Sequence, residues 1–415
     1  MEEWKEYKVE DIISEISMGP FGSDVKKEVY TSFGVPILNG SNLQGFKLKE
    51  DSFGYVSEEK ANSLKKCNAY RGDIVVTHRG TLGQIVYIPN NSKFDRYVIS
   101  QSQFRFTCNN DIVRPDFLVY LFHTKEGQHK ILSNASQVGV PALARATTTF
   151  RQIKVKIPSL SVQTKITNIL FSLDDKIEVN RRINEQLEEL AGALFKSWFV
   201  DFEPFKDGEF VESELGMIPK GWKVVEVGEL CESISVKHKF DKDELIFLNT
   251  GDIHNNIYLH NNYMPINEMP GQAKKSIRKG DILYSEIRPI NKHFAFVNFE
   301  ANDYVVSTKL MVIRCRNINN LRLYQYLTSN EIIDFLQQEA ETRSGTFPQI
   351  RFENIQRLKM IIASPIVEEQ YDKNLLPIYN KIETNNKEIH HLTTLRDTLL
   401  PKLMSGEIDV NEVKI

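Results

Sequence analysis

The sequence predicts an α+β protein: two similar mixed α/β domains separated by two long helices that form a coiled coil, with a pseudo-twofold internal duplication. Three observations predict this fold class. The chain repeats itself with a period of about 207 residues, each copy begins with about 155 residues of short β-rich runs, and each copy ends in a long segment of helical periodicity. Solenoid repeats have periods of roughly 20–50 residues, so this repeat is a duplicated domain.

The repeat consists of seven matches that keep their order along the two copies. In chain order they pair Trp4–Lys5 with Trp222–Lys223, Val9–Ser17 with Val227–Ser235, Leu38–Asn39 with Leu248–Asn249, Arg71–Val75 with Lys279–Leu283, Tyr97–Ser100 with Tyr304–Ser307, Ile157–Gln163 with Ser364–Gln370, and Lys176–Asn180 with Lys381–Asn385. Chance similarity does not keep seven matches in one order, and we infer that one module occurs twice.

The first part of each copy is predicted to be a globular domain. Runs such as 73–77 and 84–88 are rich in Val and Ile and are separated by Gly, Asn and Pro, which is typical of short strands. We therefore expect a first globular domain at residues 1–157, a helical spacer and connector at 158–210, a second globular domain at 211–364, and a C-terminal helical spacer at 365–415.

The two helical segments carry apolar residues at steps of four and three. The pattern runs over residues 166–198 in the first copy and 371–403 in the second, which predicts a coiled coil. Asn180 and Asn385 occupy equivalent positions on its seam. A buried Asn pair there would fix the register between the helices at a cost in stability, and an ordinary solvent-exposed Asn is the alternative.

Two features interrupt the symmetry of the copies. Pro377 lies inside the second helical pattern, where it removes a backbone donor, so we expect a kink or a break. The first copy instead ends in an aromatic connector, which we expect to dock on the next domain rather than on a partner protein. Its aromatic residues are Phe195, Trp198, Phe199, Phe202 and Phe205.

Composition places the chain among ordinary globular proteins. It has 415 residues, of which 41% are hydrophobic and 26% charged. No run of roughly 18 apolar residues predicts a membrane span, and the acidic N-terminus lacks the layout of a signal peptide. The four scattered cysteines, Cys67, Cys108, Cys231 and Cys315, are expected to be free thiols in a reducing cytoplasm. We therefore expect a cytoplasmic protein with no membrane partner.

Charge is distributed in alternating zones. The net charge of −3 argues against a protein that coats DNA without regard to sequence. Residues 61–160 nevertheless hold 14 Lys and Arg against 5 Asp and Glu, and residues 271–330 hold 10 against 4. The helical blocks 161–210 and 366–415 are acidic. Basic zones can meet phosphate, whereas acidic zones would be repelled by it and should face something else.

The sequence contains no motif for catalysis. It has no Pro-Pro pair, as an adenine methyltransferase motif would require, and no G-x-x-x-x-G-K-[ST] loop for a nucleotide-driven motor. There is no H-E-x-x-H, and the adjacent His390 and His391 point to different helix faces. Asp73 and Asp281 stand in turns before strands, where a structural role is expected. We predict no catalytic residue, no metal and no cofactor on this chain.

Two domains carried by long helices suit a bipartite DNA target. A continuous helix over residues 162–200 would be roughly 58 Å long at about 1.5 Å per residue. Two domains at opposite ends of an antiparallel pair could face one side of a duplex about one turn, or roughly 34–36 Å, apart. Because the domains differ in sequence, each should read a different short site, with an unread spacer set by the helices.

The residues expected to contact DNA are polar and basic side chains on glycine-rich turns and polar loops. Paired hydrogen bonds to base edges give specificity, while Lys, Arg and backbone amides hold phosphate. A surface or capping role is the alternative for each single residue, so the prediction concerns the set. Its members are Ser23, Lys26, Lys27, His78, Arg79, Thr81, Gln101, Ser102, Arg145, Thr148 and Arg151 in the first domain, and Lys274, Lys275, Arg278, Arg288, Lys292, Arg343, Ser344 and Arg351 in the second.

Several segments resemble one known family. Residues 173–180 and 193–204 are similar to the central helical region of type I restriction-modification specificity subunits. Residues 213–222 resemble that family's entry into its second recognition domain, and residues 395–408 resemble its C-terminal helical end. The resemblance covers essentially the whole chain. It departs at Pro377 and at the start of the first helix, where Val162 stands in place of Glu369 of the second copy.

The resemblance implies a non-catalytic DNA-specificity subunit. Such a chain has two target-recognition domains and two antiparallel helical spacers, and it binds double-stranded DNA and two methyltransferase subunits, which methylate adenine. Restriction/translocase subunits add ATP-dependent translocation and cleavage. S-adenosylmethionine, ATP and Mg are then implied only on the partner subunits. The residues expected at the partner contacts are Ile177, Asn180, Trp198, Phe199, Phe202, Ile382 and Asn385.

Two other functions are compatible with the residues alone. One is a coiled-coil interaction protein that never binds nucleic acid. The other is a degenerate DNA methyltransferase or nuclease whose motifs have drifted. Methyl transfer by the isolated chain would favour the enzyme, and the absence of salt-dependent DNA binding would favour the interaction protein.

Overall fold

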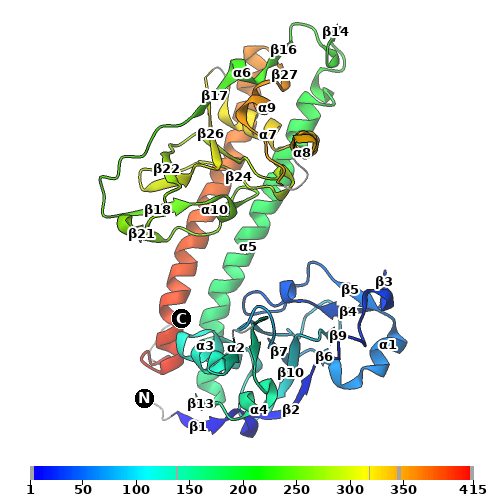
Figure 1. Ribbon diagram of the computed structural model, residues 1–415, viewed down its shortest axis with the longest axis vertical. Helices are drawn as coiled ribbons and strands as arrows, with labels where there is room; N and C mark the ends of the chain where they lie inside the picture. The colour runs from blue at the N-terminus through cyan, green and yellow to red at the C-terminus, as the bar shows by residue number, and fades with distance from the viewer. Residues whose placement is uncertain (1–3, 137–138, 317, 344–346, 412–415) are drawn as a thin grey trace. The chain divides into compact units, whose positions relative to one another are not determined.

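The computed structural model describes residues 4–136, 139–316, 318–343 and 347–411 (Figure 1). The chain divides into two compact units. Unit 1 comprises Met1–Glu178 and His390–Ile415, and unit 2 comprises Val179–Ile389. Each unit therefore contains one α/β domain together with a part of each long helix.

Unit 1 is built on two β-sheets. The first is antiparallel, in the order β2 (Ile13–Met18), β10 (Gln103–Cys108), β7 (Asp73–Thr77), β8 (Ile85–Tyr87). The second has the order β3 (Tyr30–Thr31), β5 (Gly54–Val56), β4 (Val35–Leu38), β9 (Arg96–Ile99), β6 (Asn68–Tyr70), and it is mixed because β4 pairs with β9 in parallel. Side chains alternate between the faces of a strand. Ile74 and Val76 of β7 accordingly enter one hydrophobic core, and Val75 enters another.

Helices of unit 1 close the core beside the first sheet. Pro115 begins α2 (Pro115–His123) at a position where its missing N–H is not needed. Thr124 caps α3 (Lys125–Leu132), because its hydroxyl accepts a hydrogen bond from the N–H of Gly127 at 3.0 Å. Figure 1 shows α2 and α3 beside α5 (Leu160–Phe199), and α5 residues Val162 and Ile166 belong to the same core as Phe117.

The remaining elements of unit 1 are short. The ladder of β1 (Lys5–Lys8) with β13 (Lys154–Ile157) joins the two ends of the first domain just before α5. The others are the hairpin β11 (Ala135–Ser136) with β12 (Ala142–Leu143), α1 (Glu58–Ser63), α2 (Pro115–His123), α3 (Lys125–Leu132), α4 (Ala146–Arg151), and the 3-10 helices η1 (Val9–Asp11), η2 (Lys27–Val29), η3 (Gly40–Asn42) and η4 (Lys65–Cys67).

Unit 2 repeats this plan. Its antiparallel sheet has the order β17 (Cys231–Ile234), β26 (Leu310–Cys315), β23 (Ile282–Ser285), β24 (Phe294–Phe296). Its mixed sheet has the order β21 (Tyr263–Pro265), β18 (Glu244–Leu248), β25 (Tyr304–Ser307), β22 (Ala273–Ser276), with β18 and β25 parallel. The ladder of β16 (Lys223–Glu226) with β27 (Lys359–Ile362) corresponds to that of β1 with β13.

The other elements of unit 2 include one hairpin in the connector. They are β14 (Phe210–Ser213) with β15 (Gly216–Pro219), β19 (Ile253–His254) with β20 (Ile257–Tyr258), α6 (Val227–Leu230), α7 (Asn320–Leu327), α8 (Asn330–Arg343), α9 (Phe352–Gln356), η5 (Glu203–Phe205), η6 (Thr250–Asp252), η7 (Ile266–Glu268) and η8 (Pro289–Asn291). The strands that the two units have in common keep the same order and direction, while β3 of unit 1 has no counterpart among the described residues of unit 2. The duplication and the α+β fold class predicted from the sequence are confirmed.

Two long helices, α5 (Leu160–Phe199) and α10 (Pro365–Ser405), complete the fold. In unit 2, Asn180 Nδ2 donates to Glu388 at 2.8 Å, and the Tyr379 hydroxyl donates to Glu188 at 3.2 Å. Residue numbers of bonded partners therefore increase along α5 while they decrease along α10, so the two helices are antiparallel in unit 2. In unit 1, Arg396 pairs with Asp174 at 2.9 Å.

The seam asparagines are buried. Asn180 is 2% exposed and Asn385 is 0% exposed, and Asn385 Nδ2 donates to Asn184 Oδ1 at 2.8 Å. The two residues bond to different partners rather than to each other. Since an amide bonded across a helix pair tolerates little sliding, these bonds hold the register of the helices in unit 2.

The break expected at Pro377 is absent, since α10 is helical from Pro365 to Ser405. A proline in a helix removes one hydrogen bond and leaves the carbonyl four residues earlier, here that of Lys373, without its usual donor. Pro377 and Lys373 are both exposed, so water can reach that carbonyl. The buried neighbours Leu375 and Tyr379 anchor the helix on either side.

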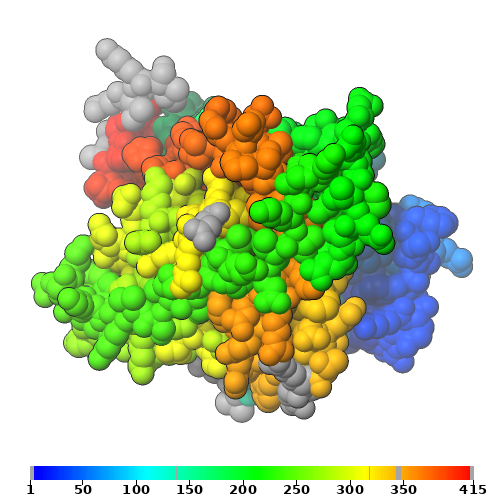
Figure 2. Space-filling model, turned by 90° about the horizontal axis from the view of Figure 1, so that it is seen from above, coloured from blue at the N-terminus to red at the C-terminus, as the bar shows by residue number. Residues whose placement is uncertain are grey.

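The aromatic connector docks within unit 2, as expected. The ring of Trp222 lies 5.7 Å from Phe199, 5.6 Å from Phe202 and 5.0 Å from Phe205, measured between centroids. An ion pair joins Lys359 to Glu214 beside the hairpin. Figure 2 shows the connector in green on the surface of unit 2.

Two further expectations concern membranes and thiols. Among the helices of the described residues, none combines the length and apolar character needed to cross a bilayer. All four cysteines are free thiols. Burial raises the pKa of Cys231 and of Cys315 to about 12, so both are poor nucleophiles at neutral pH.

Candidate nucleic-acid interface

A glycine-rich turn carries the first group of candidates in unit 1. Its start is tied to the 100–103 turn, because the N–H of Gly19 donates to Gln103 O at 2.8 Å and a Cβ on Gly19 would lie 2.0 Å from Ser100 O. Only glycine fits there. The side chain of Phe21 is 82% exposed at the tip. Ser23, Lys26 and Lys27 follow it, and all three are exposed.

The turn between β7 and β8 carries the second group. The N–H of His78 donates to Ser102 O at 2.9 Å, and the N–H of Gly80 donates to Pro141 O at 2.8 Å. Gly80 has a φ of 90°, which favours glycine. Burial lowers the pKa of His78, which favours its neutral form. Arg79 and Thr81 are exposed on this turn.

These turns surround one hollow with a volume of about 360 Å³. Four of the predicted DNA-contacting residues line it, and those residues come from two separate turns. The lining residues are Gly22, Val25, Tyr30, Ile37, Asn39, Gly40, Thr77, Arg79, Thr81, Gln84, Ser100, Gln101, Ser102 and Gln103. Arg145, Thr148 and Arg151 lie elsewhere, on α4 and the residue before it, and are exposed.

Hydrogen bonds hold the walls of the hollow. The Thr77 hydroxyl donates to Gln84 Oε1 at 2.9 Å, and Gln84 Nε2 donates to Gly40 O at 3.0 Å. Gln103 is 1% exposed, and its Oε1 accepts the N–H of Ser100 at 2.9 Å. Its Nε2 has no hydrogen-bond partner among the described residues. The hollow is therefore a polar site with bonded walls, and one of its lining residues, Gln103, has a buried donor without a partner.

Sequence reasoning did not select two of these residues as DNA contacts, Asn39 and Gln84, whereas Gln103 belongs to the polar run 101–103 that it did select. A signal was available for Asn39, because the repeat matches it with Asn249. Both residues end a strand, and the N–H of each donates to the side chain three residues later. Gln84 becomes visible only when the turns are brought together.

In unit 2 the predicted residues lie on corresponding turns and on β22. Lys274 and Arg278 are exposed. Arg288 and Lys292 lie in the turn between β23 and β24, both with positive φ, and the N–H of Arg288 donates to Pro348 O at 3.1 Å, as that of Gly80 does to Pro141 in unit 1. Arg351 precedes α9 and is exposed. Arg343 ends α8 and its side chain is not described, while Ser344 lies outside the described residues.

Lys275 has partners inside its own domain. Its Nζ donates to Thr308 O at 3.0 Å and to Leu310 O at 2.8 Å. Burial lowers the pKa of this amine. Lys275 thus ties β22 to the turn between β25 and β26. Leu310, which is fully buried, occupies the position that corresponds to Gln103 of unit 1.

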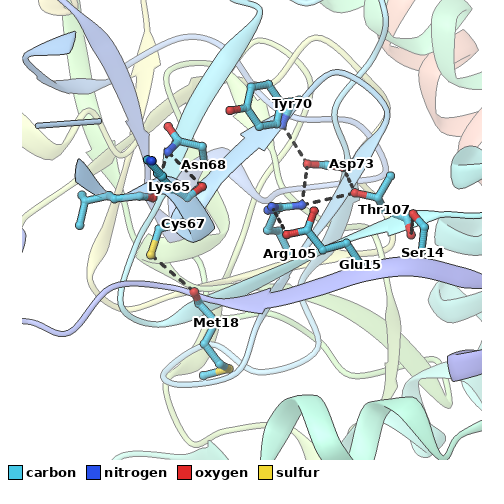
Figure 3. Close-up of polar contacts among 11 residues, drawn as sticks. Ser14, Glu15, Met18, Lys65, Cys67, Asn68, Tyr70, Asp73, Arg105 and Thr107 are labelled. Carbon is cyan, nitrogen blue, oxygen red and sulfur yellow. Dashed lines mark hydrogen bonds and ion pairs between the residues drawn. The ribbon is translucent and has the colours of Figure 1, made fainter. Parts of the chain in front are cut away.

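The two buried aspartates have structural partners, as expected. The N–H of Tyr70 donates to Asp73 at 2.9 Å, and the N–H of Arg278 donates to Asp281 at 2.9 Å. Figure 3 shows Asp73 bonded to Thr107 and paired with Arg105 at 3.5 Å. Burial is the largest cause that raises the pKa of Asp73. Among the described residues, no three His, Cys, Asp or Glu side chains group as metal ligands would.

The residues predicted for partner contacts are largely interior. Ile177, Asn180, Phe199, Ile382 and Asn385 are buried, and Trp198 and Phe202 are half-buried. Phe199 meets Tyr371 edge to face, with 4.7 Å between the ring centroids, and its ring also lies 3.4 Å from the guanidinium of the buried Arg322. The same helices expose other apolar side chains, among them Leu160, Val179 and Leu190 on α5 and Ile366, Leu376 and Leu395 on α10.

Comparison with known proteins agrees with this architecture. A family model described as "Type I restriction modification DNA specificity domain" matches residues 1–189 and 219–394. The type I restriction enzyme MjaIX specificity subunit of Methanocaldococcus jannaschii is 27% identical over 99% of this chain and 95% of its own length. The HindI specificity subunit of Haemophilus influenzae is 41% identical, over 40% of this chain and 37% of its own.

A solved structure has the same fold. The S subunit of a type I restriction-modification system from M. genitalium superposes with a TM-score of 0.58 at 16% identity, covering 97% of this chain and 96% of that one. The curated relatives are named as specificity subunits, which is a non-catalytic role. With two matched specificity domains, this chain belongs to the type I restriction-modification specificity subunits.

Proposed function

We propose that each unit reads one half of a bipartite, asymmetric duplex DNA target. The observation that carries this proposal is the duplicated frame with different side chains on it. The turn after β7 and the turn after β23 make corresponding backbone bonds, to Pro141 and to Pro348. The residues that follow the strands differ, since Arg79 of the first turn corresponds to Ile287 of the second. Two similar recognition domains with different side chains would select two different short base sequences. We call each of these half-site sequences a word.

Charge supports the same assignment. The basic zones 61–160 and 271–330 contain the β7–β8 and β23–β24 turns, and the first zone also contains α4. Exposed Lys26, Lys27 and Lys274 can neutralise phosphates without reading sequence, while the residues of the hollow provide paired donors and acceptors. Unit 1 thus has groups for both tasks, and unit 2 has Arg288 and Lys292 on the corresponding turn.

We further propose that the exposed faces of α5 and α10 bind two methyltransferase subunits, and that restriction/translocase subunits join this assembly on DNA. The helices keep apolar residues in solvent at positions such as Leu190, which is 55% exposed, and Leu376, which is 51% exposed. Their acidic blocks would disfavour DNA. S-adenosylmethionine, ATP and Mg would be bound by those partners.

The experiment is a selection from a pool of random duplexes by the assembled methyltransferase complex, followed by sequencing of the bound DNA. We expect two short, different words with an unread spacer of constant length. One heptad inserted in Val179–Leu187, with another at its counterpart on α10, should lengthen the spacer by about 10 Å, or roughly three base pairs, and leave both words unchanged.

Other outcomes would count against the proposal. If the heptad insertion altered either half-site sequence, the helices would affect base recognition and not only the spacing. A single contiguous word would contradict the two-reader account. Binding without any enriched word, or no binding at low salt, would favour a coiled-coil interaction protein that does not read DNA.

A further inference from the structure

The hollow of unit 1 has a lining suited to the edge of a nucleobase. Its polar lining consists of carboxamides and hydroxyls, with Arg79 as the one charged group among the described lining residues. The carboxamides are those of Asn39, Gln84, Gln101 and Gln103. A phosphate or carboxylate ligand would call for more positive charge. A base edge, with its alternating donors and acceptors, is read by amides and by Arg.

The size and rigidity of the hollow fit such a ligand. Its volume of about 360 Å³ lies within the range of roughly 300–1,000 Å³ that is usual for small-molecule sites. Gly22 stands at the rim, close to the exposed side chain of Gln101. Thr77 and Gln84 are bonded across the wall. A site held this firmly is preorganised for its ligand.

Gln103 provides the second, independent observation. This side chain is 99% buried, its Oε1 is used by Ser100, and its Nε2 donor has no partner within the described chain. Buried donors are nearly always paired, because an unpaired one loses its bond to water and gains none. An acceptor on a base, such as a ring nitrogen or a carbonyl oxygen, would provide the bond.

Unit 2 shows that the fold does not need these groups. Leu310 replaces Gln103, and Lys309 replaces Ser102, where it pairs with Glu286 at 3.3 Å. Lys275 bonds to the carbonyls of this turn from the inside. The turn of unit 2 therefore accommodates an apolar residue at the position of Gln103, with Lys275 holding it from the other side. In unit 1 the Oε1 of Gln103 holds the turn through Ser100, and its Nε2 is not used by the turn.

We propose that this hollow is the base-reading site of unit 1 and takes one nucleobase of the first half-site by its hydrogen-bonding edge. Gln103 donates from the floor, and Arg79 and Gln101 contact the base from the rim. The inference rests on the proposed DNA-reading function and adds to it the site, its ligand and the residue at its floor.

The test is the same duplex selection with the assembled complex, carried out with Gln103→Leu. This variant copies the residue of unit 2, which the fold accommodates. We expect base preference to fall roughly 5- to 150-fold at one position of the first word, because one well-placed amide or Arg contact provides discrimination of that order. The second word should be unchanged, which reports that the chain is folded and assembled.

Two further variants separate reading from general attraction. Gln101→Leu should weaken preference at the same or the adjacent position. Lys26→Met, which removes an exposed cation outside the hollow, should lower affinity for all sequences alike and leave both words intact. If Gln103→Leu leaves the first word unchanged while the second is also intact, the hollow is not the reading site. If the wild-type complex selects no words, the proposed function itself fails.

A free nucleoside offers the same base chemistry without DNA. Equilibrium dialysis of the complex with adenosine, guanosine, cytidine and thymidine distinguishes the two sources. We expect no saturable binding that depends on Gln103 below millimolar concentrations. Gln103-dependent nucleoside binding together with unaltered DNA selection would overturn the assignment to DNA.

Discussion

The two units differ in the side chains that fill the turn between β9 and β10 in unit 1 and the corresponding turn between β25 and β26 in unit 2. In unit 1 the turn at 100–103 places the amide of Gln103 at the floor of a polar hollow. In unit 2 the corresponding turn carries Leu310 and is held from within by Lys275. The backbone bonds around the two turns correspond, as those to Pro141 and Pro348 show.

The comparison indicates how the side chains of a duplicated recognition domain can change while its backbone is kept. Backbone bonds and buried strands hold the frame, so side chains on the turns are free to change without loss of the fold. The buried acids behave similarly. Asp73 is the first residue of β7 and Asp281 directly precedes β23, which are corresponding positions. Asp73 bonds to Thr107, whereas Asp281 forms a two-bond pair with Arg314 at 2.8 Å and 2.8 Å.

The largest loss of stability should follow from breaking the ion pair between Asp281 and Arg314. Arg314→Met removes the cation from Asp281, which is fully buried, and should cost about 3 kcal/mol, because breaking a buried pair leaves an uncompensated charge. Arg105→Met should cost less, about 1–2 kcal/mol, since Asp73 keeps its bonds to Tyr70 and Thr107. Hydrogen exchange of β26 and of β10, followed by mass spectrometry, measures both losses separately.

Equal losses of exchange protection in β26 and β10 would contradict the expected difference between the units, because they would mean that Asp73 and Asp281 depend on their arginines to the same degree. A loss larger in β10 would reverse it. A matched exposed control is Arg278→Met, whose side chain lies outside both pairs and should change neither strand's protection by more than about 0.5 kcal/mol.

A smaller, pH-dependent effect is expected at Glu188 of unit 2. Burial raises the pKa of this carboxyl, although Asn256 and Tyr379 donate to it. The folded protein therefore holds the proton more tightly than the unfolded chain. Stability contributed by this group is fully present below the unfolded pKa of about 4.3 and declines as pH rises toward the raised folded value.

Glu188→Gln should flatten that decline, because a neutral amide keeps the shape of the carboxyl and has no proton to lose. Unfolding by urea, followed by tryptophan fluorescence between pH 4.5 and 7.5, measures the slope, since Trp198 and Trp222 both lie in unit 2. Glu189→Gln, at an exposed neighbouring position, serves as the control. An identical slope in Glu188→Gln and wild type would show that burial of Glu188 is not felt as a pH effect.

The sequence predicted most of the fold because its strongest signals are periodic and repeated. Heptads located both long helices, and the ordered matches implied equal strand orders. The prediction of a break at Pro377 was wrong, because sequence alone does not show that this proline lies on a solvent-exposed face, between the buried Leu375 and Tyr379. One missing hydrogen bond is outweighed there by packing on both sides.

The candidate site was predictable only in part. Polar residues on glycine-rich turns led to Arg79, Thr81, Gln101 and Ser102, which the structure places around one hollow. The role of Lys275 was not visible, because whether a lysine faces solvent or a carbonyl depends on the turn beneath it. Turns distant in sequence meet through backbone bonds, and no local pattern records which turns will meet.

The central claim is that each unit reads its own word. It is tested most directly by duplex selection with two variants at corresponding turns, Arg79→Met in unit 1 and Arg288→Met in unit 2. The account predicts that each variant relaxes base preference in one word only, and in different words. Loss of both words in either variant, or relaxation of the same word by both, would contradict it.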